Sequence, residues 1–228
     1  MLNLFNFDYY NEPFEYCESK NTFNKEFYIK LSKTFPKLDK IQKEIDEDKT
    51  FSKAINRIDI NLKNIEQIYL DKIWLDLINS VTSIDYFYEL CDKLKIKKEN
   101  YKTISPRHLN KDTDIFVDFQ FAYNIKNEFK YKQFIRPPHV DSTDKLIVIL
   151  IYFPEKNDDQ YVENDYGYLQ LYDTTIKNFK KIEYKNNHAI IIKNSANAFH
   201  APYTLLNHKD ENRRFVNIVY MKNELFKI

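Results

Sequence analysis

The chain has 228 residues, a formal net charge of +1 and a single glycine, Gly167. A soluble chain of this length at ~7% glycine would carry roughly 16. Loops that bind phosphate through two or more glycines are therefore excluded, and with them the P-loop and the dinucleotide-binding fingerprint. Hydrophobic residues make up 43% of the chain, which is enough for a buried core and argues against disorder.

The charges nearly cancel, with 35 basic against 34 acidic residues, so we expect neither nucleic acid nor a membrane as a partner. The N-terminal residues include acids and no basic stretch, unlike a secretory signal peptide. The longest apolar run, residues 146–153, is too short to span a bilayer. Cys17 and Cys91 lack metal-type spacing, and we expect reduced thiols in a cytoplasmic protein, with one disulfide as the alternative.

Residues 21–100 have apolar side chains three and four positions apart, which predicts helices. The first runs over residues 23–35 and stops at Pro36, the second over 65–81, and the third over about 83–95. A stripe of this kind can contact a partner or a membrane, but packing against the protein's own core is the commoner use. We therefore expect these helices to cover the core.

After Ile104 the pattern changes to strands. Residues 114–124 alternate apolar with polar side chains, and 145–153 are apolar on both faces, as in a central strand. Further strands are expected within residues 167–173, 188–193, 197–203 and 213–221. We predict an α+β fold in one domain, 1–228, with 1–104 a mainly helical lead-in and 105–228 closing into a sandwich or barrel.

One pair of residues before the central strand has the composition of a metal site. His139 and Asp141 are two positions apart, so on an extended backbone an imidazole and a carboxylate point to the same side. The pair alone is a weak signal, because His208 and Asp210 have the same spacing. That second pair lies in a polar segment without a flanking strand, and we interpret it as solvated surface. A surface turn remains the alternative for the first pair.

A third ligand and an anion-binding residue follow in the chain. A facial triad takes two histidines and one carboxylate and leaves three positions on the metal open, and His200 supplies the second histidine. A core histidine is its alternative role. Two arginines, Arg213 and Arg214, then begin a strand, where a planar guanidinium can hold a carboxylate in a two-pronged contact. A salt bridge is the alternative there.

Taken together, His139-x-Asp141, His200 and Arg214 resemble the Fe(II)/2-oxoglutarate-dependent oxygenase superfamily, in its prolyl-hydroxylase-like branch with small bacterial and viral relatives. The resemblance extends over the segments "RPPHVDSTDKLIVILIYF", "DYGYLQLYD" and "NNHAIIIKNSANAFHAP". It is specific for residues 114–220 and loose before them.

The resemblance implies a double-stranded β-helix of the jelly-roll or cupin type, with the helical segment packed on it. It implies Fe(II) on His139, Asp141 and His200, and 2-oxoglutarate and O₂ as co-substrates. Arg214 would bind the distal carboxylate of 2-oxoglutarate and Tyr152 would donate to it, although ordinary core packing is a similar expectation for Tyr152. We prefer Arg214 to Arg213 because it lies six residues before Tyr220.

The implied reaction is hydroxylation of a C–H bond in a small molecule or a peptidyl residue, with release of succinate and CO₂. The alternative is a cupin-type module that binds a metal and a ligand without turnover. We assign no role to His108 or His188. For Arg136 we expect local surface pairing, with a place at the pocket mouth as the alternative. Gly167 falls where the family usually has paired glycines, and we predict a positive φ or a close backbone approach there.

Overall fold

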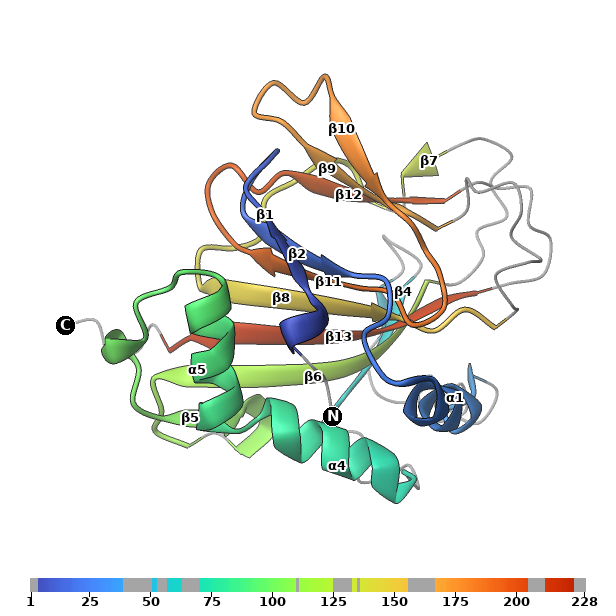
Figure 1. The fold of residues 1–228 in the computed structure, drawn as a ribbon, viewed down its shortest axis with the longest axis vertical. Coiled ribbons are helices and arrows are strands. Elements are labelled where there is room, and N and C mark those ends of the chain that lie inside the picture. The colour runs from blue at the N-terminus through green and yellow to red at the C-terminus, as the bar shows by residue number, and fades with distance from the viewer. Residues whose placement is uncertain are drawn as a thin grey trace.

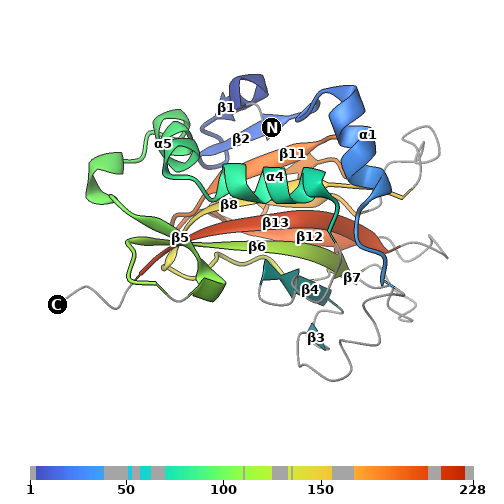
Figure 2. The same ribbon diagram turned by 90° about the horizontal axis from the view of Figure 1, so that it is seen from below.

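The computed structural model describes residues 4–38, 51–52, 57–62, 70–109, 111–124, 133–134, 136–155, 167–204 and 212–223. Within these ranges the chain forms a large sheet, a small sheet facing one side of it, and helices on its other side (Figures 1 and 2). A cavity whose lining includes the predicted metal ligands lies between the two sheets.

The large sheet combines strands from both halves of the chain. Its order is β1 (Asp8–Tyr10), β2 (Tyr16–Ser19), β11 (Ala189–Lys193), β8 (Lys145–Tyr152), β13 (Arg213–Lys222), β6 (Ile115–Asn124), β4 (Arg57–Asn61) and β3 (Phe51–Ser52). These neighbours are antiparallel. A further strand, β5 (Ile104–Pro106), pairs in parallel with β6.

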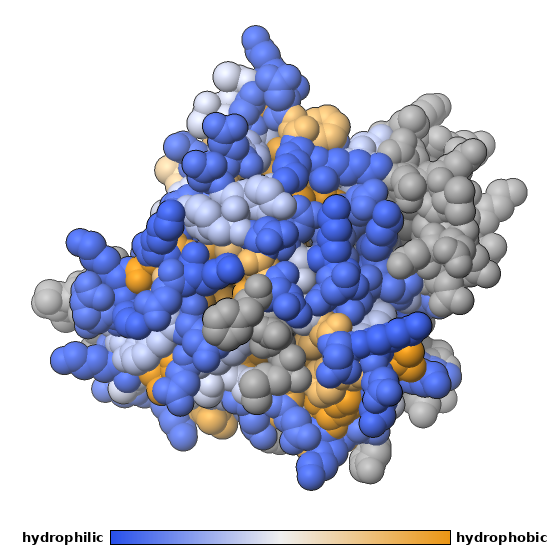
Figure 3. Space-filling view, viewed as in Figure 1, coloured by the Kyte–Doolittle hydropathy of each residue, from blue (hydrophilic) through white to orange (hydrophobic). Residues whose placement is uncertain are grey.

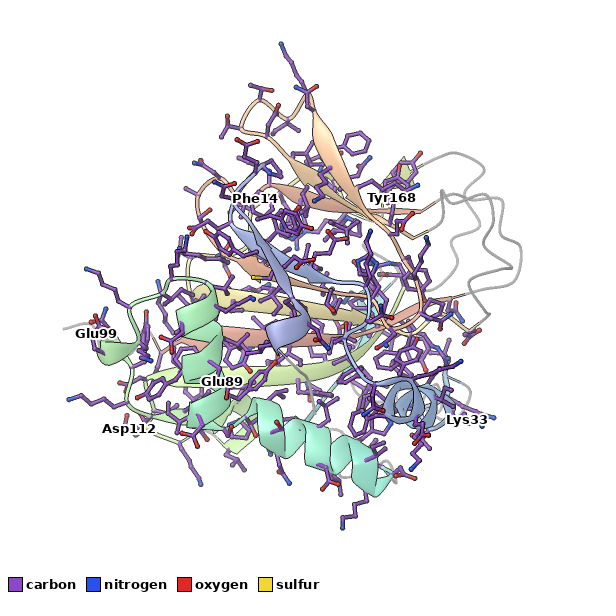
Figure 4. The ribbon with its side chains drawn as sticks, in the orientation of Figure 1. Phe14, Lys33, Glu89, Glu99, Asp112 and Tyr168 are labelled. Atoms are coloured by element: carbon purple, nitrogen blue, oxygen red, sulfur yellow. The ribbon has the colours of Figure 1, made fainter. Side chains whose placement is uncertain are left out.

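The small sheet has the order β10 (Phe179–Ile182), β9 (Leu169–Tyr172), β12 (His200–Thr204) and β7 (Gln133–Phe134). From β6 to β13 the chain therefore passes repeatedly between the two sheets, and only β9 and β10 follow one another in the same sheet. The inner faces of the two sheets enclose a hydrophobic cluster that includes Leu150, Leu171 and Phe215. Figure 4 shows Phe14 and Tyr168 near the small sheet, in the upper part of the view.

Three α-helices begin where a polar side chain accepts a backbone N–H of the first turn, which satisfies a group that the helix leaves unpaired. Asn24 does so for α1 (Lys25–Lys33), Asp71 for α4 (Lys72–Val81) and Ser83 for α5 (Ile84–Lys93). The structure thereby confirms helices within residues 23–35 and 83–95. The helix predicted over 65–81 begins only at Lys72, because Leu70 and Asp71 are not helical and Asp71 is the N-cap, while residues 63–69 lie outside the described part. Short 3₁₀ helices are η1 (Leu4–Asn6), η3 (Lys98–Asn100) and η4 (Arg107–Leu109).

An aromatic cluster joins the helices to the outer face of the large sheet. Trp74 of α4 is fully buried, with ring centroids 4.8 Å from Phe121 and 5.5 Å from Phe153. Phe87 of α5 stacks on Tyr220 of β13 at 5.5 Å. Each such ring buries 150–250 Å², so these contacts supply much of the stabilisation of the helical layer.

The sequence pattern did not predict several strands. β1, β2 and β4 come from the segment expected to be mainly helical, and all three belong to the large sheet. All four residues of β2 are buried, so they show no alternation between apolar and polar side chains. The strand β10 was not predicted for the opposite reason, since most residues of its sequence "FKKI" are accessible to solvent.

The view in Figure 3 is mostly hydrophilic, with several small, separate hydrophobic patches. None of the helices that the structure describes has both the length and the hydropathy needed to cross a bilayer.

Candidate metal centre

The two histidines predicted to bind a metal are held side by side by the backbone. His139 precedes β8 and His200 is the first residue of β12. They form an isolated antiparallel bridge in which the N–H of His139 donates to the carbonyl of His200 at 3.1 Å and the reverse bond measures 2.9 Å. This bridge connects the segment before the large sheet's central strand to the small sheet, and it fixes the imidazole centroids 4.6 Å apart.

Asp141 completes a cluster with them. One possible ligand atom from each of His139, Asp141 and His200 lies within 4.8 Å of the others. Nδ1 of His139 lies 2.8 Å from the carbonyl of Pro137, and Nδ1 of His200 lies 2.9 Å from that of Ala198. Because a carbonyl only accepts, each Nδ1 carries the proton, and each Nε2 presents its lone pair to the cluster.

The protonation of the cluster suits a cation. Burial, and after it the neighbouring His200, lowers the pKa of His139 to about 4. Burial also lowers the pKa of His200, although Asp141 opposes this. Both imidazoles are therefore neutral at pH 7, which is the form that binds metal ions.

Lys145, the first residue of β8, contacts the carboxylate of the cluster. Its ammonium lies 2.7 Å from Oδ1 of Asp141, while Oδ2 lies 3.8 Å from Nε2 of His200. Burial by itself would raise the pKa of Asp141, but Lys145 and then His200 outweigh it and lower the pKa. The carboxylate is therefore ionised, with one oxygen turned to Lys145 and the other to the histidines.

The cluster opens into a cavity between the two sheets. The cavity encloses about 640 Å³ not filled by protein atoms, its open mouth included. Besides the cluster and Lys145, its lining consists of Arg57, Asn124, Arg136, Val148, Leu150, Leu169, Ile192, Pro202, Arg213, Phe215 and Asn217.

Arg213 is a buried cation in this lining, with 2% of its surface exposed. Its Nε donates to the carbonyl of Gly167 at 2.7 Å and its Nη1 to Oδ1 of Asn124 at 3.0 Å, while Nη2 has no partner in the described part of the chain. The guanidinium also lies 4.5 Å from the ring centroid of Phe215. Within the described ranges no carboxylate pairs with it, so its charge is stabilised only by dipoles and ring faces.

The prediction that Arg214 faces the pocket is wrong by one residue. Arg214 points to the helical side, where its guanidinium donates to the carbonyls of Phe153 and Pro154 and to the hydroxyl of Ser32 on α1. Consecutive side chains of a strand lie on opposite faces, so Arg213 takes the cavity side. The sequence could not settle this because both faces of β13 are buried, which removes the hydrophobic alternation that fixes register.

Tyr152 lies next to Arg213 rather than in the lining of the cavity. Its ring centroid is 5.0 Å from the Arg213 guanidinium carbon, and its hydroxyl is buried without a hydrogen-bond partner among the described residues. Burial raises the pKa of this phenol, with Arg213 opposing, so the hydroxyl keeps its proton. Its contact with a co-substrate stays a prediction.

The remaining sequence-based predictions have mixed outcomes. Cys17 and Cys91 are both buried free thiols, as expected. His188 is buried against Glu18, with Nε2 3.0 Å from the carboxylate. Arg136 lines the cavity, the alternative place that the sequence analysis gave it, and forms no ion pair within the described part of the chain. His208 and Asp210 lie outside the described residues.

Three polar residues of the lining were missed by the sequence analysis: Arg57, Asn124 and Asn217. They come from β4, β6 and β13, and in the register of the sheet Arg57 pairs with Asn124, which pairs with Arg213. A polar residue inside an apolar strand is the one signal that could have indicated Asn217. Nothing in the sequence indicates which strands become neighbours.

No protein-family model matches the chain, and no curated protein matches it in sequence. Solved structures match in fold. A prolyl hydroxylase from Trichoplax adhaerens, in complex with a hypoxia inducible factor peptide fragment, gives a TM-score of 0.51 at 14% identity over 91% of this chain and 83% of its own. IDO from Bacillus thuringiensis gives 0.53 at 11% identity, covering 92% and 90%.

A full-length protein from Neurospora crassa, solved in complex with alpha-KG (2-oxoglutarate), gives a TM-score of 0.51 at 12% identity, covering 91% of this chain and 73% of its own. Identities this low establish a likeness of fold alone. The structural neighbours of this chain are thus prolyl hydroxylases and related 2-oxoglutarate-binding proteins, whose fold it shares across nine-tenths of its length.

Proposed function

We propose that the chain is an Fe(II)/2-oxoglutarate-dependent dioxygenase that hydroxylates a C–H bond. One observation carries the proposal: the cluster of His139, Asp141 and His200 opens into the same cavity as Arg213, a buried cation that no described carboxylate neutralises. Neutral imidazoles with a carboxylate can hold a divalent ion, and the guanidinium can hold an anion beside it.

The donor set fits Fe(II). Two imidazole nitrogens and one carboxylate oxygen form the facial triad of non-haem Fe(II) oxygenases, which leaves three positions for co-substrates. The Nδ1–H bonds to Pro137 and Ala198 fix the orientation of the rings, as outer partners of metal-bound histidines commonly do. Lys145 takes up one oxygen of Asp141 and so favours coordination through the other.

Arg213 fits 2-oxoglutarate. Its Nη2 is the unsatisfied donor next to the cavity, and a charge-assisted hydrogen bond donated by Nη2 to the distal carboxylate of 2-oxoglutarate would satisfy it. In this proposal Arg213 takes the role that the sequence analysis gave to Arg214. The apolar side chains of Val148, Leu150 and Phe215 would line the space between the guanidinium and the triad.

When bound, Fe(II) supplies the redox chemistry that couples reduction of O₂ to decarboxylation of 2-oxoglutarate and oxygenation of the substrate. The residues of the chain position and shield these reactants. Arg213 anchors one end of the co-substrate, and the apolar lining limits the access of water to the reacting end. The cluster, with both imidazoles neutral and the carboxylate ionised, is ready to bind the ion without releasing protons near pH 7.

We further infer that strands β6 to β13 form the double-stranded β-helix that the resemblance implies. The four strands β6, β8, β11 and β13 are adjacent in the large sheet, and β7, β9, β10 and β12 make up the small one. This passage between two facing sheets is typical of jelly rolls.

The proposal is tested by binding and turnover in one preparation. Purified protein is loaded with Fe(II) without O₂, its metal content is measured, and 2-oxoglutarate is added while visible absorption is recorded. We expect one Fe(II) per chain and a new absorption band, followed by succinate formation when O₂ is admitted. The variants H139A and D141A should lose the metal, and H108A serves as the control because His108 lies outside the cluster.

Two results would contradict the proposal. Succinate formation by H139A or D141A at the wild-type rate would mean that these residues are not ligands. An Fe(II)-loaded protein that shows no absorption change with 2-oxoglutarate would instead favour a cupin-type module that binds a metal without turnover.

A further inference from the structure

Asn217 is a buried amide in the wall of the cavity. It lies in the middle of β13, opposite Gln120 of β6 on one side and Leu150 of β8 on the other. Only 6% of its surface is exposed, and its Oδ1 has no hydrogen-bond partner in the described part of the chain. A buried carbonyl oxygen without a partner is destabilising, so a ligand that supplies a donor would be favoured at this position.

The hydrogen-bond network determines which atom of the Asn217 side-chain amide has no partner. The carboxylate of Asp118 only accepts, so Gln120 must present its Nε2 to it, at 2.8 Å. Oε1 of Gln120 then accepts from Nδ2 of Asn217 at 2.7 Å and from Nη2 of Arg57 at 3.2 Å. Turning the Asn217 amide over would place two acceptor oxygens against each other, so Oδ1 is the atom left without a partner.

The co-substrate of the proposed reaction cannot satisfy this oxygen. At neutral pH 2-oxoglutarate has two carboxylates and a ketone, all of which accept hydrogen bonds and none of which donates. A donor for Oδ1 of Asn217 would therefore come from another occupant of the cavity, either a water molecule or a further reactant. The molecule that is oxidised is the occupant that the reaction requires.

The charge of the lining adds a second requirement. Arg57, Arg136, Lys145 and Arg213 are cationic, and Asp141 is the one carboxylate among the described lining residues. Lys145 pairs with Asp141 and Arg57 pairs with Asp59, each at 2.7 Å. With Arg213 assigned to the co-substrate, Arg136 is left as an exposed cation without an ion pair in the described ranges.

We propose that the substrate is a small carboxylic acid that also carries an N–H or O–H group, with Arg136 taking the carboxylate and Asn217 accepting from the donor. This inference rests on the proposed function, since it assigns Arg213 and the triad to the co-substrate and the metal. An α-amino acid and a 2-hydroxy acid both meet the requirement.

The test compares matched ligands in protein loaded with Mn(II) and 2-oxoglutarate without O₂, by titration calorimetry. The panel holds the common L-amino acids and their 2-hydroxy analogues. Each binder is paired with an analogue that lacks the donor, either N-trimethylated or O-methylated, and with its primary carboxamide, which lacks the charge. We expect at least one parent acid to bind about tenfold more tightly than both of its analogues.

Two variants then assign the preferences to residues. In N217A the preference for the donor-bearing acid over its methylated analogue should fall to about twofold or less, while N79A, a substitution of an exposed asparagine on α4, retains it. In R136Q the preference for the acid over the carboxamide should fall in the same way. K33Q, which removes a lysine at the outside of α1 (Figure 4), serves as the charge control. Ratios within one variant do not depend on the fraction of active protein.

The outcomes separate the two proposals. If 2-oxoglutarate itself does not bind, the proposed function has failed. If 2-oxoglutarate binds but no acid of the panel binds or increases succinate formation, the inference about the substrate is overturned and the proposed function stands. Unchanged ratios in N217A and R136Q would also overturn it, as would tighter binding of the neutral analogues.

Discussion

The Nε–H of Arg213 donates to the carbonyl oxygen of Gly167 at 2.7 Å, so the one glycine of the chain holds the buried cation of the cavity in place. Gly167 has φ +67°, and a Cβ built on it would lie 3.1 Å from Cδ1 of Tyr184 and 3.2 Å from Cδ of Arg213. The structure confirms both alternatives predicted from the sequence, a positive φ and a close approach. The glycine is required because it leaves room for the arginine.

Replacing Gly167 with alanine should lower the free energy of unfolding by about 2 kcal/mol. The left-handed backbone costs an alanine about 1 kcal/mol, and the added methyl must displace Tyr184 or Arg213. Chemical denaturation measures the change, with N79A as a surface control. A loss below about 0.5 kcal/mol would show that the neighbouring side chains yield freely. The same variant should bind 2-oxoglutarate more weakly, because the guanidinium shifts.

Arg213 and Arg214 should differ sharply in their effect on 2-oxoglutarate. R213Q should weaken its binding by about 30-fold, since a hydrogen bond to a charged group contributes about 1.5–3 kcal/mol. R213K should weaken it less, because the charge remains and the planar fork is lost. R214Q should leave the Kd within about twofold, because Arg214 contacts Ser32, Phe153 and Pro154 on the other face.

Anaerobic titration of each variant with 2-oxoglutarate measures these constants. A large effect of R214Q together with a small effect of R213Q would reverse the register that the structure assigns to the start of β13.

Trp74 should dominate the attachment of the helices to the large sheet. W74A should reduce the free energy of unfolding by about 3–5 kcal/mol, the usual cost of removing a buried aromatic side chain. The adjacent L75A is the matched control and should cost less than about 1 kcal/mol, because Leu75 is 46% exposed. Trp74 is the only tryptophan, so its fluorescence in the wild type reports directly on this contact. Equal losses in the two variants would contradict this arrangement.

The turn between β9 and β10 should titrate at unusually low pH. Hydrogen bonds from Thr175 and then from Asn178 lower the pKa of Asp173 to about 2, with Thr175 Oγ1 at 2.7 Å and Asn178 Nδ2 at 2.9 Å. A depressed carboxyl pKa stabilises the fold fully above its unfolded value of about 3.9. That contribution is lost as the pH falls through about 2.

Carboxyl chemical shifts in NMR should therefore show Asp173 titrating near pH 2 in the wild type. In T175A the midpoint should move upward, because the largest of the stabilising hydrogen bonds is removed. An unchanged midpoint in T175A would mean that the hydrogen bond from Thr175 to Asp173 does not stabilise the carboxylate.

The grouping of the candidate metal ligands His139 and Asp141 could be predicted from the sequence because it depends on local geometry. His139 and Asp141 are two apart on extended chain, and the backbone alone places such side chains on one side. His200 begins β12, and the sequence pattern also predicted a strand there, within residues 197–203. The helices at 23–35 and 83–95 were predictable for the same reason, since an exposed and a buried face alternate along them.

The strands of the N-terminal half were not predictable, and neither was the choice between Arg213 and Arg214. β2 and β13 are buried on both faces, so their sequences have no alternation from which a face can be read. β1 has only three residues, and β4 does alternate but lies within the stretch whose apolar spacing predicted helices. Asn217 could be noticed as a polar residue in an apolar strand. Which of its amide atoms is left without a partner depends on Asp118 and Gln120 of the neighbouring strand.

The sequence by itself thus determined which residues are candidate metal ligands, their order and the class of chemistry they favour, because local backbone geometry and residue chemistry decide these. Only the tertiary structure decided which side of β13 faces the cavity and that the single glycine makes room for Arg213. The physical reason is that these depend on pairing between strands far apart in the chain, and a strand buried on both faces does not record its register in its own residues.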